Sequence, residues 1–185
     1  PTLTDDPSPI ESKVGEVISL DANNWFTSSA GTLANWLTNI GAGETLPTTL
    51  SIDGAAGTDT GVISGKIDDT ADSYTVDIRV SDDNGTTDSQ ITWVVYNYSL
   101  EFTGTTRLED TGGSPYSGTV NFSAIKGTID NADLATGTVV DFGSKTVTSG
   151  VVSLSDSNLT SGTWTVFAQD NSDSTILGVY EIVAE

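Results

Sequence analysis

The sequence predicts an all-β protein made of two tandem β-sandwich domains, and three patterns support this prediction. The central run Tyr74–Ser81 alternates apolar and polar residues, as a strand with one buried and one solvated face does. The polar turn Asp82–Gly85 joins it to a second alternating run around Trp93, which predicts a β-hairpin. Residues 161–168 repeat the small residues, the aromatic residue and the alternation of residues 71–78, so we expect a second sandwich.

The first domain is expected over residues 1–96. Pro7 and Pro9 exclude helix from the N-terminal lead-in, which is therefore expected to be extended. Short apolar runs separated by loops with Gly, Thr or Pro predict its other strands, at Glu16–Asp21, Leu50–Asp53 and Gly61–Ile67.

An apolar segment interrupts this regular pattern after the first of these strands. It contains Trp25, Phe26, Trp36 and Leu37, which make it too apolar for a free loop. Residues 33–37 fit either one helical turn or a strand. Trp25, Phe26 and Trp36 either pack in the core or form a partner-binding surface. Exposed tryptophans would also stack on sugar faces, as in a carbohydrate-binding accessory module.

The second domain is expected over residues 97–185, after the linker Tyr96–Tyr98, which has no Gly or Pro. Trp164 lies in phase with Val166 on one strand face, so we expect it to anchor the core rather than to hold a ligand. Alternating runs predict the strands of this domain, at Ser99–Thr103, Val120–Ile125, Val139–Phe142, Val151–Leu154, Ser161–Ala168 and Ile176–Val183.

Composition excludes several classes of function. With 6 basic and 26 acidic side chains, the chain has a formal net charge of −20 and is repelled by nucleic acid and anionic membranes, so neither is expected as a partner. It has no Cys, His or Met, so disulfides are excluded and zinc lacks its usual ligands. The commonest general base and the thiol nucleophile are missing too, and we do not expect an enzyme. No apolar run approaches the roughly 18–20 residues that a membrane span needs.

Pairs of aspartates in two turns are the candidate metal ligands. Asp68 and Asp69 precede the central hairpin, and Asp82 and Asp83 form its turn. Aspartates in turns commonly accept hydrogen bonds from their own backbone. Clustered carboxylates also bind calcium, so these four residues are candidates for a calcium site, and no other cofactor is expected.

Four strand motifs of the first half carry a resemblance to a known family: Leu50–Ile52, Gly61–Gly65, Ser73–Val76 and Val80–Asp82. Together they resemble the Ig-like, dystroglycan-type cadherin-like domains of bacterial surface proteins and phages, over about residues 1–96. The resemblance implies an Ig-like sandwich, and in that family a run of aspartates after the first core strand often marks calcium binding. Here the matching segment Asp21–Trp25 has a single carboxylate. The second half looks like the small Ig-like modules of phage structural proteins.

Two origins of the chain are compatible with its first residue. Pro1 permits removal of a preceding initiator methionine, so a complete gene product without a secretion signal is one expectation. A virion component fits that origin, because it leaves the cell by lysis. The other expectation is a fragment of a larger secreted protein.

These observations lead to two hypotheses of function. The first is a non-enzymatic protein of a virion surface: a phage head decoration, head fibre or tail component. One Ig-like domain would dock on capsid or tail proteins, often as a symmetric homo-oligomer, and the other would be displayed. The alternative is an extracellular bacterial adhesin segment at the cell surface, serving as a calcium-dependent spacer or ligand-binding module. Fold alone does not choose between them.

Overall fold

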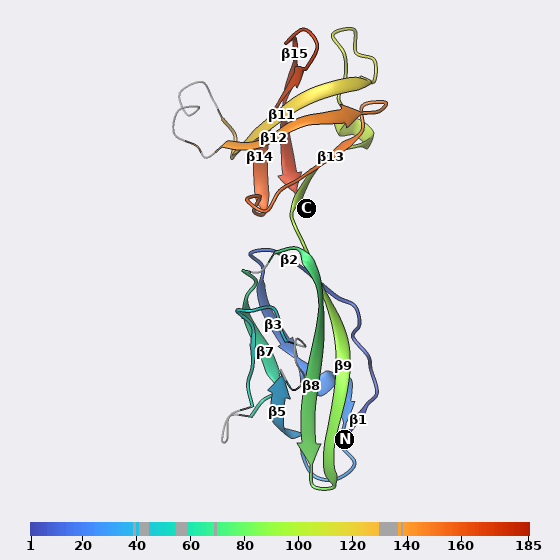
Figure 1. Ribbon diagram of the computed structural model, residues 1–185, viewed down its shortest axis with the longest axis vertical. Coiled ribbons are helices and arrows are strands. Elements are labelled where there is room, and N and C mark those ends of the chain that lie inside the picture. The colour runs from blue at the N-terminus through green and yellow to red at the C-terminus, as the bar shows by residue number, and fades with distance from the viewer. Residues whose placement is uncertain (39, 41–44, 55–58, 69, 130–136, 138) are drawn as a thin grey trace. The chain divides into compact units, whose positions relative to one another are not determined.

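The computed structural model describes the whole chain except residues 39, 41–44, 55–58, 69, 130–136 and 138 (Figure 1). The protein is all-β, as predicted, and its regular structure consists of strands with two short 3-10 turns in the described residues. No helix in this part of the chain is long and apolar enough to span a membrane. The chain divides into two compact units, Pro1–Tyr96 (the first unit) and Asn97–Glu185 (the second unit).

The first unit is an Ig-like sandwich of two sheets with strand orders β2-β9-β8-β5 and β3-β7-β6, and a short pair β1-β4 beside them. Its largest element is the predicted hairpin, in which Asp82 pairs with Gly85 across a two-residue turn. The strands are β1 (Thr2–Leu3), β2 (Ile10–Lys13), β3 (Val17–Asp21), β4 (Phe26–Thr27), β5 (Ala34–Thr38), β6 (Ser51–Ile52), β7 (Val62–Lys66), β8 (Asp72–Asp82) and β9 (Gly85–Tyr96).

Alternation along the hairpin creates the core of the first unit. Val76, Ile78 and Val80 point to one side of β8 and are fully buried, while the residues between them face outward. Trp93 from β9 is also fully buried, and its indole Nε1 donates a hydrogen bond of 2.8 Å to Ser12 Oγ on β2. The buried polar atom of the tryptophan is thereby satisfied.

The second unit is also a sandwich, with a four-stranded sheet β12-β11-β14-β15 and a two-stranded sheet β10-β13. All strand pairs in it are antiparallel. The elements are β10 (Ser99–Phe102), the 3-10 turn η2 (Gly104–Thr106), β11 (Gly118–Lys126), β12 (Val139–Val147), β13 (Val152–Ser155), β14 (Gly162–Asp170) and β15 (Ile176–Ala184).

Aromatic side chains fill the core between these two sheets. Trp164 is 3% exposed and in phase with the fully buried Val166, as expected of a core anchor. Its indole Nε1 donates a 2.9 Å hydrogen bond to the carbonyl oxygen of Thr160. Phe102 from β10 lies with its ring centroid 5.0 Å from that of Tyr180 on β15, in an edge-to-face contact.

Candidate functional site

The three aromatic residues proposed for a partner surface lie in the core of the first unit. Trp25 ends the 3-10 turn η1 (Ala22–Trp25) and is 8% exposed, Phe26 is 5% exposed, and Trp36 is 1% exposed. The rings of Phe26 and Trp36 meet edge to face with their centroids 5.6 Å apart. Residues 34–38 form β5, the strand alternative, which directs Trp36 inward.

This burial favours core packing over the partner-binding or sugar-stacking surface. An aromatic ring that binds a sugar or a protein partner must present a face or edge to solvent, and these three side chains present almost none. The physical reason is area: each aromatic side chain removes roughly 150–250 Å² of surface from water when it is buried. The small first unit uses them to complete its core.

The four candidate metal ligands do not form one site. Asp69 lies outside the described residues, and Asp68 is an exposed residue whose carboxylate is 3.9 Å from Lys66 Nζ. Asp82 ends β8, an eleven-residue strand that begins only four residues after Asp68. Such a strand spans about 33 Å, so Asp68 and Asp82 lie at opposite ends of the hairpin. Within the described residues, no group of three or more acidic side chains is placed to hold a metal ion.

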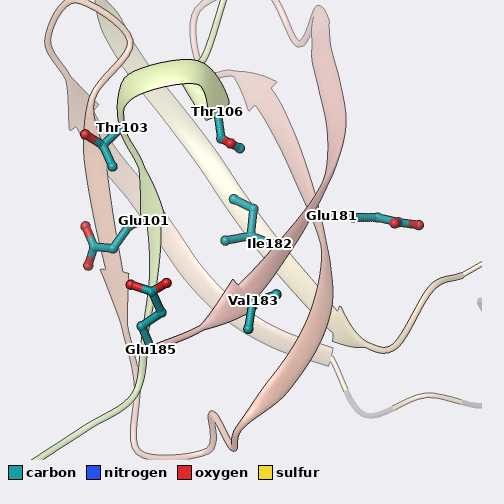
Figure 2. A pocket seen from close by; sticks show the side chains of 7 residues that line it. All are labelled: Glu101, Thr103, Thr106, Glu181, Ile182, Val183 and Glu185. Carbon is teal, nitrogen blue, oxygen red and sulfur yellow. The ribbon is translucent and has the colours of Figure 1, made fainter.

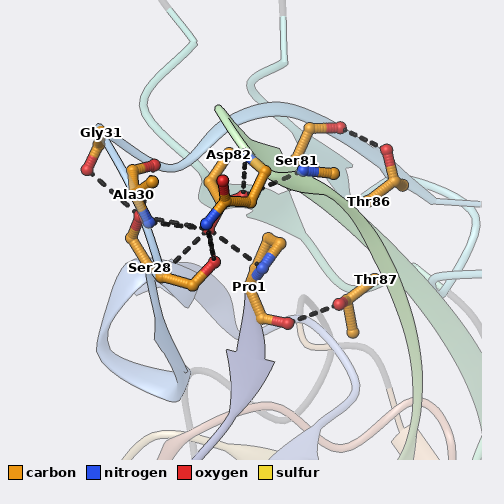
Figure 3. A network of polar contacts seen from close by, with 11 residues as sticks. Pro1, Ser28, Ala30, Gly31, Ser81, Asp82, Thr86 and Thr87 are labelled. Atoms are coloured by element: carbon orange, nitrogen blue, oxygen red, sulfur yellow. Dashed lines mark hydrogen bonds and ion pairs between the residues drawn. The ribbon is translucent and has the colours of Figure 1, made fainter.

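The Asp82 carboxylate is instead the centre of a polar network within the first unit (Figure 3). Its side chain is fully buried. It accepts hydrogen bonds from the backbone N–H and hydroxyl of Ser29, at 2.7 and 2.8 Å, and from the N–H groups of Asn84 and Gly85, at 2.8 and 3.1 Å. The Pro1 amino nitrogen lies 3.1 Å away. The network joins the loop at residues 28–31 to the hairpin turn.

These donors leave Asp82 fully ionised at neutral pH. Burial raises the pKa of Asp82, but the hydrogen bonds from Ser29 and Asn84, with the Pro1 amino group, lower it by more, so the pKa lies well below its ordinary value of 3.8. Protein donors already occupy both carboxylate oxygens. Asp83 is exposed, and its backbone N–H donates to the carbonyl oxygen of Ala30 at 3.1 Å. The Asp82 side chain therefore accepts hydrogen bonds from the backbone of its own turn, as turn chemistry predicts, whereas the contact of Asp83 is made by its backbone.

A surface groove of about 310 Å³ lies in the second unit, a feature that no sequence motif indicated (Figure 2). One wall comes from β10 and η2, and the other is β15. The lining residues are Glu101, Thr103, Thr106, Glu181, Ile182, Val183 and Glu185.

The groove forms because β10 and β15 separate. At one end they are joined by two hydrogen bonds, from Ser99 N to Glu185 O at 3.0 Å and from Glu185 N to Ser99 O at 3.1 Å. Beyond Ser99, β10 pairs with β13 in the other sheet, while β15 continues along β14. The far edge of β15 therefore receives no further backbone hydrogen bond from any residue that the structure describes.

Exposed apolar side chains concentrate on the same strand. Ile176 is 71% exposed, Val179 57% and Val183 56%. Eight large hydrophobic side chains are exposed in the described part of the chain, and these three all belong to β15. An apolar strand with an open edge is a surface suited to contact another chain.

Comparison with known proteins adds a structural likeness. No family model and no curated protein matches the sequence. Among solved structures, extracellular domains 3–5 of Drosophila OTK are similar, with 10% sequence identity and a TM-score of 0.37. The match covers 96% of this chain and 59% of that chain, so the present chain spans less than two thirds of it. A likeness of this size carries no argument about function.

Proposed function

We propose that the chain is a non-enzymatic structural or accessory protein that docks on a larger protein assembly through its second unit and displays its first unit. The observation that carries the proposal is β15, an edge strand with three exposed apolar side chains beside an unfilled groove. Monomeric proteins usually cover or charge such edges, because an open edge pairs readily with another chain.

We propose a virion surface as the assembly, with capsid or tail proteins as the partners. The resemblance of the second half to Ig-like modules of phage structural proteins supports this choice. The net charge of −20 supports it as well, because it keeps a displayed domain soluble and away from the packaged nucleic acid. A lattice of identical capsid or tail subunits would present repeated docking sites, on which the chain would sit as a symmetric oligomer.

The alternative is an adhesin segment at an extracellular or cell surface. It is supported by the cadherin-like motifs of the first half. A calcium-dependent version of it requires ligands in the turns, where Asp68 and Asp83 are exposed.

Antibody labelling of particles and cells tests the two assignments. Antibodies raised against the purified chain would be applied to virus particles and to cells from its source, and the gold label would be located by electron microscopy. The proposal predicts label at regular positions on purified particles. Label confined to the cell envelope would contradict the virion assignment and support the adhesin alternative. Label on neither would contradict both.

A further inference from the structure

We propose that the open edge of β15 accepts an extended, basic segment of the partner protein, which adds to the sheet as a fifth strand. The inference rests on the proposed function and specifies its docking surface and the chemistry of its partner. Three independent features carry it: the direction of the backbone groups, the regular and unprotected edge beside the groove, and the charge of the groove.

The backbone of β15 presents unused hydrogen-bonding groups to the groove. In an antiparallel pair, successive residues direct their N–H and C=O groups to alternate sides of the strand. Glu185 directs both groups to Ser99, on the side away from β14. The register of β15 on β14 is continuous from Ala184 back to Gly178, so Val183 and Glu181 direct theirs to the same side. Along the groove, these groups form a ladder that lacks a partner strand in the described part of the chain.

Other sheet edges of the described structure carry protective features within the strand. On β15 the register shifts only near its start, at Leu177, and the pairing is regular over the residues beside the groove. On β12, the opposite edge of the same sheet, the register shifts beside Gly143, and Lys145 adds a charge. On β5, the edge of the hairpin sheet, the register also shifts, and Asn35 has a positive φ of 54°. Bulges and lysines are common means of preventing strand addition. The nine residues of β15 include no proline and no basic residue.

The negative charge of the groove favours a basic partner segment. Three of the groove's lining residues are glutamates, Glu101, Glu181 and Glu185, and none of the lining residues is basic. Figure 2 shows Glu101 and Glu185 on one side of the groove and Glu181 pointing away on the far side of β15. A second copy of this chain, itself at −20, would bring like charges together. Val179, Glu181 and Val183 occupy every second position of β15 and therefore share one face. A strand that carries Lys or Arg between apolar residues on that same face would instead place its charges beside the glutamates and cover the two valines.

Peptide binding to the full chain tests this inference. The probe is a capped eight-residue peptide in which two valines are followed by two lysines and the block is repeated once, so that each face of the strand carries both residue types. The control probe is the same peptide with N-methylated valines, which keeps the charge but loses half of the backbone donors on each edge. The test variant is V183P, because proline removes the N–H that faces the groove and is tolerated on an open strand edge. V183T is the matched control, because it keeps this N–H and the β-branched shape. E181K tests the charge.

We expect the unmodified peptide to bind and to protect the amides of Glu181 and Val183 from hydrogen exchange. V183P should weaken binding by at least about tenfold at an unchanged melting temperature, whereas V183T should weaken it by no more than about threefold. E181K should weaken binding by several-fold and make the binding less dependent on salt. Equal binding of both peptides, equal binding to V183P, or protection elsewhere on the chain would overturn the inference. Dimerisation of the free chain that V183P abolishes would also overturn it, since the occupant would then be a second copy.

The two proposals fail in different ways. If wild-type chain is missing from purified particles, the proposed function fails whatever the peptide does. If V183P remains on particles at the wild-type amount, the function stands and the β15 inference fails.

Discussion

At the scale of single residues, one aspartate organises the main turn in each unit. Asp82 ends β8 and binds the N–H groups of the turn that follows it. Asp170 ends β14 and accepts hydrogen bonds from the N–H and hydroxyl of Ser172, at 2.7 and 2.6 Å, and from the hydroxyl of Tyr116. The bonds from Ser172 and then Tyr116 lower the pKa of Asp170 to about 2, and that of Tyr116 rises to about 12. The two halves, whose strand patterns repeat, therefore also share the use of a strand-ending aspartate to stabilise the turn that follows.

The network around Asp82 predicts an acid-sensitive first unit. Because the pKa of Asp82 is lower in the folded state than its ordinary value of 3.8, its contribution to stability is fully present above that value and is lost as pH falls through the folded pKa. D82N should therefore lower the melting temperature at pH 7. The difference in melting temperature between D82N and wild type should become smaller below about pH 4.

The matched control for this prediction is D83N, because Asp83 is exposed and makes its turn contact through the backbone. It should leave the melting temperature nearly unchanged at both pH values. A D82N protein as stable as wild type at pH 7 would contradict the role assigned to the network.

At the scale of strands, local alternation in the sequence predicted where strands form. It did not predict the order of the strands in the sheets. The patterns of β8, β9 and β14 predicted strands because one face of each is buried, and the residues that alternate inward are the ones in the cores. The open edge of β15 depends on the order β12-β11-β14-β15 and on the pairing of β10 with β13, which no local pattern contains. The contact of Ser29 with Asp82 joins residues 53 positions apart, so the turn aspartates could be found from sequence but their donors could not.

The buried face of β8 predicts a large cost for truncation. I78A removes most of a fully buried side chain from the first unit and should lower its free energy of unfolding by about 2–5 kcal/mol. The matched control is I176A, which makes the same chemical change at a site 71% exposed and should change stability by less than about 0.5 kcal/mol. Urea denaturation of both variants measures the difference. Similar stability losses for the two would contradict the assignment of inner and outer faces.

At the scale of the whole molecule, the chain combines a strongly acidic composition with an apolar edge strand in its second unit. The net charge of −20 follows from the composition alone. From it we expect that nucleic acid is not a partner. Among the described aspartates that suggested calcium, Asp68 and Asp82 lie at opposite ends of the central hairpin, and Asp82 is already bonded. The described residues contain no group of three or more acidic side chains placed to hold a metal ion. Three of the eight large hydrophobic side chains that are exposed in the described residues lie on β15.

This distribution predicts little response to calcium. Thermal melts in millimolar calcium and in EDTA should agree within about 2 °C, because Asp82 has protein donors on both oxygens and Asp68 is far from it. A calcium ion bound only to the folded state at a hundredfold excess over Kd would add about 2.7 kcal/mol and raise the midpoint by about 10 °C or more. A shift of that size would contradict the assignment of the turn aspartates and favour the adhesin alternative.

The central claim is that the second unit docks through β15, and hydrogen exchange of the full chain on purified particles tests it most directly. Amide exchange would be compared between the free chain and the chain bound to particles. If β15 is the docking strand, residues 176–184 and the walls of the groove gain protection on the particles, while the first unit exchanges as it does in the free protein. Protection confined to the first unit, with β15 unchanged, would contradict it.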